Sequence, residues 1–229
     1  MENTNHHIND HSIDSKIIAQ QIFDQVFRTT TEKPGFAYLD LGKNSDSYQL
    51  RKLMVDIKYQ LDELVRQEFD KKLTYQWLTR FDQQENTKFH QDNAGDQSFL
   101  MLGYEPTIIQ SELYIADYVK FSYDYQIDPV DFFEKYNPLF IDQNEELEPY
   151  ITKVQGIRSD HFQIFLINNS NSAGKSETLG VLHQAKMIKT DTSRSRIVNS
   201  MMLNMINKDD IQHSNSNEQE FMTTTQVNE

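Results

Sequence analysis

Two side chains with metal-binding groups stand two residues apart within residues 87–102, TKFHQDNAGDQSFLML. They are His90 and Asp92. In a β-strand, residues i and i+2 point to the same face, so both side chains would project into one space if a strand continues here. One imidazole and one carboxylate make an incomplete metal site. A third ligand from a distant strand would complete a 2-His-1-carboxylate set with open positions, which suits non-haem Fe(II).

His183 is the candidate for the third ligand. It stands in TLGVLHQAKMI, where Val181, Ala185 and Met187 share its face of an expected strand, so it should face an apolar interior. A hydrogen-bonded core histidine is the alternative for an isolated residue, but the upstream candidates favour a ligand. His161 begins a strand and is predicted to be a surface or turn residue. Solvated positions in polar ends of the chain are expected for His6, His7, His11 and His213.

Two arginines follow His183 by 11 and 13 residues, in TDTSRSRIVNSMML. They are Arg194 and Arg196, and a short turn into the next strand would bring either one near the metal. A guanidinium there could hold a carboxylate through two parallel hydrogen bonds. A solvated basic pair at a strand start is the other interpretation. Arg196 is preferred because apolar strand residues follow it directly, whereas Arg194 is nearer the turn.

Helices are expected first along the chain, and strands after them. Apolar stripes at helical spacing predict helices over residues 14–28 and 47–69, with a short strand at PGFAYLDLG between them. A later helix is expected at DPVDFFEKYNP, with Asp128 as N-cap and Asn137-Pro138 as stop. Strands are predicted at LTYQWLTRFD, TKFHQD, QSFLMLGYE, SELYIADYVKFSYDY, HFQIFLINN, TLGVLHQAKMI and SRIVNSMMLNMI. This order predicts an α+β, mainly β domain built around an antiparallel sandwich or barrel.

One domain is expected over residues 13–206, between polar tails at 1–12 and 207–229 that are predicted to be disordered. The aromatic-rich segment 105–156 could be an insertion that forms a lid over the open metal face, or the core of an added helix and hairpin. Arg80, Asn93 and Ser98 lie close to the His90 motif in sequence. They are candidates for the lining of the pocket.

Composition excludes several classes of function. The chain has 229 residues, 37% of them apolar, and no cysteine, so disulfides, thiolate catalysis and Cys-ligated metals are excluded. Its net charge of −13, without a Lys/Arg cluster, disfavours nucleic-acid binding. No run approaches about 18 apolar residues, so no membrane span is expected. The first residues lack a basic start and an apolar stretch, which predicts a cytoplasmic protein without a secretory signal.

The order and spacing of these residues resemble the Fe(II)/2-oxoglutarate-dependent oxygenase superfamily. Its signature is His-x-Asp/Glu, a distal His, and an Arg or Lys some ten residues further on. The matching residues are His90 and Asp92 in FHQDNAGDQSFLML, His183 in GVLHQAK, and Arg196 or Arg194 in SRSRIVNSMML. The resemblance covers about residues 14–206. It implies a double-stranded β-helix, or jelly roll, with supporting N-terminal helices and iron between its two sheets.

The resemblance also implies a dioxygenase. Fe(II) held by His90, Asp92 and His183 would bind 2-oxoglutarate and O₂, and a small-molecule or carrier-bound substrate would be hydroxylated with release of succinate and CO₂. Arg196, or Arg194, would bind the far carboxylate of 2-oxoglutarate. Other residues that could line this cofactor pocket are Arg80 and Ser98. Asp92 separates the chain from related halogenases, which carry a small residue in place of the carboxylate.

Two other classes of function remain open from the sequence. A non-catalytic jelly-roll or cupin-like binding module would keep the strands without a working triad. A hydrolase with a different metal is the third, although the chain shows no paired acidic cluster and no Gly-x-Ser-x-Gly motif. In an oxygenase the side chains of His90, Asp92 and His183 must meet at a common point, whereas in a binding module they would diverge.

Overall fold

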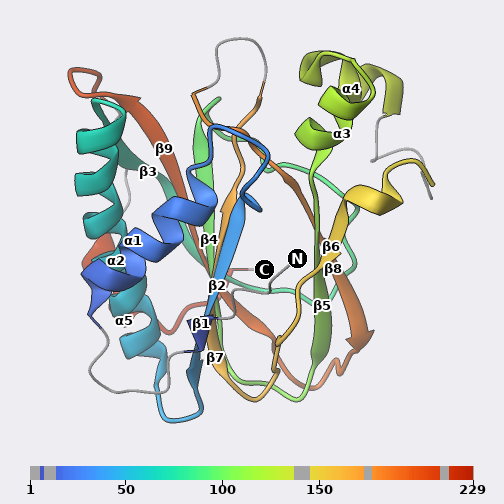
Figure 1. The fold of residues 1–229 in the computed structure, drawn as a ribbon. Coiled ribbons are helices and arrows are strands. Elements are labelled where there is room, and N and C mark those ends of the chain that lie inside the picture. Colours follow the sequence, from blue (N-terminus) through green and yellow to red (C-terminus); the bar gives the residue numbers. More distant parts are fainter. Residues whose placement is uncertain (1–5, 8–13, 137–144, 173–176, 212–216, 229) are drawn as a thin grey trace.

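The computed structural model describes residues 6–7, 14–136, 145–172, 177–211 and 217–228. Two β-sheets face one another, and helices cover the outer face of the larger one (Figure 1). The strands of the larger sheet are β1 (His6–His7), β2 (Phe36–Gly42), β7 (Phe162–Asn168), β4 (Ser98–Tyr104), β9 (Ile197–Asn207) and β3 (Lys71–Asp82), in this spatial order. The strands of the smaller sheet are β6 (Ile151–Lys153), β5 (Gln110–Ala116) and β8 (Leu182–Lys189).

The pairing in both sheets is antiparallel apart from β1, which pairs with β2 in parallel. This confirms the predicted α+β, mainly β class. The described strands do not close into a barrel, because each sheet has its own order of strands. A single antiparallel bridge between His90 and His183 ties the loop before β4 to β8.

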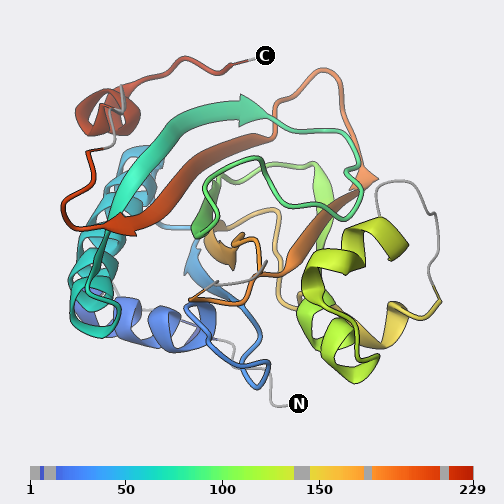
Figure 2. The same cartoon turned by 90° about the horizontal axis from the view of Figure 1, so that it is seen from above.

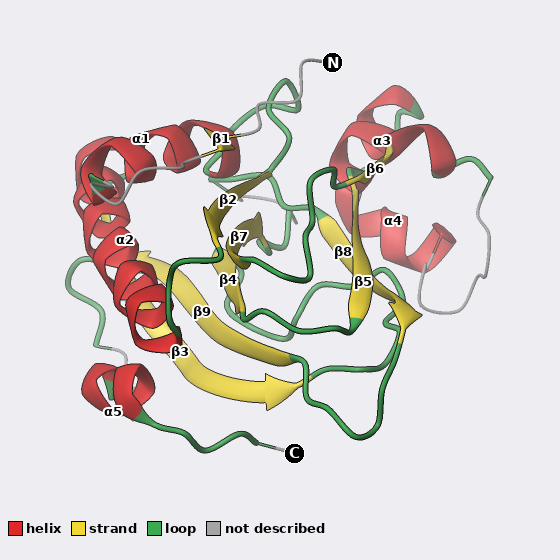
Figure 3. Cartoon of the chain, turned by 90° about the horizontal axis from the view of Figure 1, so that it is seen from below, coloured by secondary structure: helices red, strands yellow, loops and turns green. Residues whose placement is uncertain are grey.

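Helices α1 (Ser15–Val26) and α2 (Ser47–Glu68) lie on the outer face of the larger sheet, as Figure 3 shows from below. Asp46 and Gln49 form a capping box at the start of α2: the Asp46 side chain accepts from the Gln49 backbone, and the Gln49 side chain accepts from the Asp46 backbone. A Cβ at Gly103 would lie 2.6 Å from the Met54 sulfur, so glycine permits the close approach of α2 to β4.

Alternation along β4 divides the interior into two cores. Phe99 and Met101 point toward α1 and α2, whereas Leu100 and Leu102 point into the space between the sheets. A run of consecutive apolar residues is therefore required, because both faces of this strand are buried. The inner core between the sheets also surrounds the site described below.

One predicted strand is wrong, and a second is confirmed only in its first half. Residues 87–92 form a loop whose only ladder contact among the described strands is the His90 bridge. Residues 111–125 begin as β5 but continue as α3 (Tyr118–Asp124). The change occurs at Asp117, whose side chain caps α3 through the Lys120 backbone N–H and also pairs with the buried Arg28 at 2.6 Å.

The segment 105–156 supplies part of the second sheet. Helix α3 packs with α4 (Pro129–Tyr136) around Tyr118, Phe121 and Phe132, which are all fully buried. A short 3-10 helix, η1 (Glu148–Tyr150), leads into β6. Asp128 caps α4 as predicted, while its predicted stop at residues 137–138 lies outside the described residues. The aromatic residues of α3 and α4 thus form a core of their own.

The prediction of a disordered tail over 207–229 is wrong for residues 217–228, here named the C-terminal strap. Its helix α5 (Glu218–Thr223) is capped by Asn217 and inserts Phe221, 4% exposed, into the core under α2. Met222 packs against the same core, and polar contacts, including those to the buried Arg51 and Arg80, hold the rest of the strap. At the other end, His6 and His7 form β1, and the remainder of the predicted tail lies outside the described residues.

A search of the helices in the described ranges finds none with both the length and the apolar character needed to cross a bilayer.

Candidate metal centre

His90, Asp92 and His183 converge on a common point. Each offers one ligand atom, and these three atoms lie within 4.8 Å of one another. The His90 Nε2 and an Asp92 carboxylate oxygen are 3.5 Å apart, and the two imidazole centroids are 4.2 Å apart. The convergence expected from the sequence is therefore present, although the residues that carry His90 and Asp92 are a loop and not a strand.

Backbone hydrogen bonds hold this loop against β8. His90 and His183 exchange both backbone bonds, with N···O distances of 3.1 and 3.0 Å. Asn169 fixes Asp92 from the other side: its side chain accepts from the Asp92 N–H at 2.8 Å and donates to the Asp92 carbonyl at 3.0 Å. All these contacts use the backbone of His90 and Asp92, so both side chains remain available to a ligand.

The free nitrogens of the histidines fit a metal ion. His90 Nδ1 donates to the Lys88 carbonyl at 2.7 Å, so Nε2 is the nitrogen that faces Asp92 and that can bind a metal once its proton has left. Such a carbonyl partner is the usual support of a ligating histidine. His183 is 6% exposed, and its Nδ1 is buried without a hydrogen-bond partner among the described residues. Two neutral nitrogens and one carboxylate are the donor set that non-haem Fe(II) takes.

Of the two histidines in this cluster, His90 has the higher pKa and is the one that binds a proton first. The pKa of His183 is lowered to about 4, mainly by burial. The neighbouring His90 lowers this pKa as well, by more than Asp92 raises it. Burial also acts to lower the pKa of His90, but the hydrogen bond to Asp92 and those to backbone carbonyls outweigh it and raise the pKa above 6.5. Burial would raise the pKa of Asp92, yet the hydrogen bond with His90 keeps it below its usual value. At a pH below the raised pKa of His90, Asp92 is therefore an anion beside a protonated His90, while His183 is neutral above about pH 4.

Metal affinity should depend on a single proton in mildly acidic solution. A divalent metal must displace the proton on His90, whereas His183 is already neutral above about pH 4. Affinity is therefore expected to fall about tenfold for each pH unit between about 6 and 5. Equilibrium dialysis with Co²⁺ at several pH values measures this slope. A metal affinity that falls with two protons would mean that His183 is charged as well. A metal affinity that does not change with pH would mean that His90 is not a ligand.

The three residues lie at a cavity of about 290 Å³ between the two sheets, here named the metal cavity. Trp77, Thr79 and Phe81 of β3 form one wall by strand alternation. Leu113 is the described residue of segment 105–156 that lines it, so α3 and α4 do not cover it as a lid. The other lining residues are Gln83, Thr87, Leu100, Leu102, Tyr104, Ala185 and Ser200.

Arg196 is buried close to the metal cavity, and Arg194 is exposed. The Arg196 guanidinium donates to Gln83 Oε1 at 2.9 Å and to Ser111 Oγ at 2.7 Å, and lies 4.4 Å above the ring of Tyr104. Gln83 and Tyr104 both line the metal cavity, so Arg196 stands directly behind its wall. A smaller neighbouring cavity is lined by Arg196 itself.

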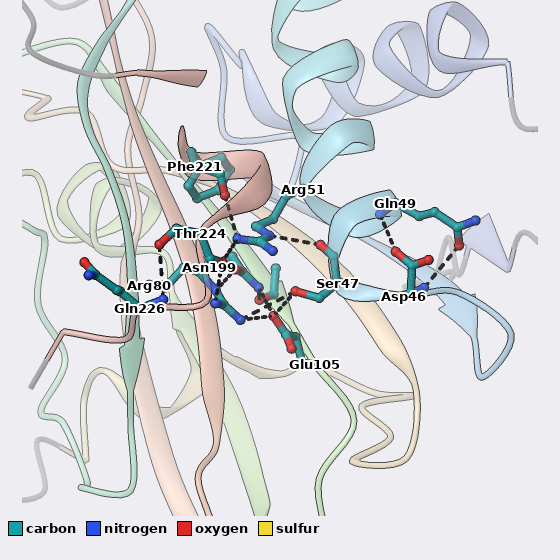
Figure 4. A network of polar contacts seen from close by, with 11 residues as sticks. Asp46, Ser47, Gln49, Arg51, Arg80, Glu105, Asn199, Phe221, Thr224 and Gln226 are labelled. Atoms are coloured by element: carbon teal, nitrogen blue, oxygen red, sulfur yellow. Dashed lines mark hydrogen bonds and ion pairs between the residues drawn. The ribbon is translucent and has the colours of Figure 1, made fainter. Parts of the chain in front are cut away.

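Arg80 does not line the pocket, and this prediction is wrong. Because it alternates with Thr79 and Phe81, it points to the opposite face of β3. There it donates to Glu105 at 2.9 Å, to Asn199 Oδ1 at 2.9 Å and to the carbonyl of Thr224 at 2.9 Å (Figure 4). Proximity in sequence to His90 was misleading, since one residue of offset along a strand exchanges the two faces.

We expect Arg80→Ala to reduce stability and not metal affinity. The substitution leaves the partly buried Glu105 without its cation, and breaking a buried pair costs about 3–5 kcal/mol. The free energy of unfolding from urea titration should fall by about that amount. Arg158→Ala, at an exposed ion pair, is the control and should change it by less than about 0.5 kcal/mol. If a folded Arg80→Ala protein bound Co²⁺ more weakly than the parent, Arg80 would contribute to the metal site after all.

Ser98 and Asn93 also lie away from the metal cavity. Ser98 is fully buried at the far end of β4, where its hydroxyl donates to the Asn169 carbonyl and accepts from the Asn169 amide. Its predicted role in cofactor binding is wrong; it supports Asn169, which in turn holds Asp92. Asn93 is exposed.

His161 is buried, contrary to its predicted surface position. Its Nδ1 lies 2.7 Å from a carboxylate oxygen of Asp40, which is 2% exposed. The partner comes from β2, 121 residues earlier, and local sequence carries no signal of it. Asn169 was missed for the same reason. Period-two alternation in LTYQWLTRFD could have placed Trp77, Thr79 and Phe81 on one face.

No protein-family model matches this sequence, and a search of curated proteins finds no significant match.

Proposed function

We propose that this chain is a non-haem Fe(II)- and 2-oxoglutarate-dependent oxygenase of the double-stranded β-helix type. The observation that carries the proposal is the convergence of His90, Asp92 and His183 beside a cavity between two antiparallel sheets. One carboxylate and two imidazoles would hold such an ion and would leave positions open for a co-substrate and O₂.

Bound Fe(II) would supply the redox chemistry that couples oxidation of 2-oxoglutarate to oxidation of a substrate. The residues of the chain have simpler tasks. His90 loses its proton to become a ligand, and the Lys88 carbonyl keeps its ring in the required orientation. Asp92 supplies the negative charge, and Asn169 holds its backbone so that the loop need not move.

Arg196 is the proposed partner of the far carboxylate of 2-oxoglutarate. Arg196 is 5% exposed, and its guanidinium donates to Gln83 and Ser111. A carboxylate could accept in place of the Gln83 amide and form the stronger charge-assisted bonds. Tyr104 keeps the guanidinium plane fixed by stacking, and this preorganisation favours a planar anionic group.

The walls of the metal cavity suit a reaction that must be shielded from water. Trp77, Phe81, Leu100 and Leu102 present carbon surface, and Asp92 is the one carboxylate in the described lining. A small molecule, or the end of a carrier-bound one, with an uncharged reacting group fits such walls. Apolar walls also keep the electrostatic contacts of the site strong.

The test is formation of succinate. Protein loaded with Fe(II) under nitrogen is mixed with 2-oxoglutarate, a metabolite panel and O₂, and succinate is followed by mass spectrometry. The proposal predicts succinate that depends on iron and is lost in Asp92→Ala. A protein that binds Fe(II) at His90, Asp92 and His183 but forms no succinate with any member of the panel would instead favour a binding module.

A further inference from the structure

The outer wall of the metal cavity is a strand at the edge of the larger sheet. β3 is the last strand in the order and pairs with β9 on one side. Trp77, Thr79 and Phe81 point from β3 into the metal cavity. The other side of an edge strand carries backbone groups that can bind a further segment, so what lies there affects this wall.

The C-terminal strap approaches this edge from the helix side. Its helix α5 is fixed at the start by Glu218, whose carboxylate accepts from the hydroxyls of Tyr59 at 2.9 Å and Tyr75 at 2.7 Å. Tyr59 comes from α2 and Tyr75 from β3, so Glu218 joins the strap to both. With Phe221 buried in the core, α5 has a defined place.

Two arginines hold the end of α5. Arg51 Nη1 donates to the carbonyls of Phe221 at 2.6 Å and Thr224 at 2.8 Å, and Arg80 Nη1 donates to Thr224 at 2.9 Å (Figure 4). Both guanidinium groups are buried, and these carbonyls satisfy donors that would otherwise lack partners. The carbonyl end of a helix also favours positive charge. The chain therefore leaves α5 in a fixed direction, toward β3.

Beyond Thr224 the strap runs beside the edge of β3, as Figure 2 shows from above. The Asn228 N–H donates to the Arg80 carbonyl at 2.8 Å, and Asn228 and Phe81 form a parallel bridge. The Asn228 side-chain amide donates to Thr79 Oγ1 at 2.6 Å. One residue of the strap thus contacts the strand at two residues that line the metal cavity, Thr79 and Phe81.

We propose that the C-terminal strap completes the outer wall of the metal cavity, and that Asn228 governs which molecules enter by fixing Thr79 and the end of β3. Asn228 is a positioning residue in this scheme, because it acts through Thr79. Without its two hydrogen bonds the edge of β3 is free to move away from the smaller sheet, and the cavity widens on that side. This inference rests on the cavity alone and holds whatever reaction the metal performs.

The fluorescence of a tryptophan in the wall of the metal cavity can report on the entry of small molecules. Trp77 is the single tryptophan, and it lines the metal cavity two residues from Thr79. Quenching of its fluorescence by acrylamide, a small neutral molecule, measures entry directly in the metal-free protein. Asn228→Ala removes the side-chain bond to Thr79, and Asn228→Pro also removes the backbone donor to Arg80. Thr225→Ala changes an exposed strap residue for which no side-chain hydrogen bond is described and is the matched control.

The quenching constant is expected to be unchanged in Thr225→Ala, higher in Asn228→Ala, and at least about twofold higher in Asn228→Pro. Both Asn228 variants should keep the circular dichroism spectrum of the parent, because α5 remains anchored through Arg51 and Glu218. Equal quenching in Asn228→Pro and Thr225→Ala would overturn the proposal. That outcome would leave the oxygenase proposal intact, since the measurement involves neither metal nor 2-oxoglutarate.

Discussion

Asp92→Ala is expected to lower the affinity for Fe(II) or Co²⁺ by more than about 100-fold, because loss of a mere supporting partner of a metal ligand already costs 10–100-fold. Turnover should be lost with the metal. The fold should persist, because Asn169 holds residue 92 by its backbone and the Asp92 side chain is 30% exposed. Anaerobic equilibrium dialysis gives the affinity, and circular dichroism reports the fold.

Asp96→Ala is the matched control for this variant. Asp96 is an exposed residue of the same loop, and its carbonyl accepts from the Asn171 N–H. The control removes the same charge four residues away and should leave metal affinity within about twofold of the parent, as for an exposed substitution. If Asp92→Ala bound metal as tightly as Asp96→Ala, the assignment of the triad would be wrong.

Arg196→Ala is expected to raise the KM for 2-oxoglutarate by at least an order of magnitude. Removing one partner of a buried charge pair costs about 2–5 kcal/mol. That range corresponds to roughly 30-fold to several thousand-fold in affinity. Metal binding should stay intact, because Arg196 lies behind the cavity wall at Gln83 and Tyr104 and not beside the triad. Lysine at this position should rescue only in part, since it lacks the planar fork.

Arg194→Ala supplies the comparison. Arg194 is exposed and stands two residues before Arg196, so its loss should change KM by less than about twofold. A damaging Arg194→Ala together with a neutral Arg196→Ala would move the carboxylate site toward the turn. If neither variant changed KM, the assignment of 2-oxoglutarate as co-substrate would fail.

Sequence spacing predicted the ligand set but not how it is held. The His-x-Asp pair and His183 were found by residue type and an assumed strand, yet the His90 segment is a loop held by β8 and Asn169. Strand alternation does not apply to residues 87–92, but it does apply to β3, where Trp77, Thr79 and Phe81 face the metal cavity. The same alternation directs Arg80 away from the metal cavity.

Long-range polar contacts explain what the sequence could not reveal. The helices α1 and α2 and the long strands β3 and β9 follow from apolar periodicity, which is local. The burial of His161 depends on Asp40, and the order of the C-terminal strap depends on Arg51 and Arg80. In each case the polar partner that stabilises the buried contact lies more than 100 residues away along the chain. The local sequence therefore carries no sign of the contact, and composition alone suggests exposure.

Anomalous diffraction from crystals grown with Mn²⁺ tests the central claim most directly. The ion is a redox-stable substitute for Fe(II) with similar ligand preferences. A single strong peak is expected between the two sheets, bonded to His90 Nε2, an Asp92 carboxylate oxygen and a ring nitrogen of His183. Crystals of the intact fold with no peak there, or with the ion bound elsewhere, would contradict the metal centre and the function proposed from it.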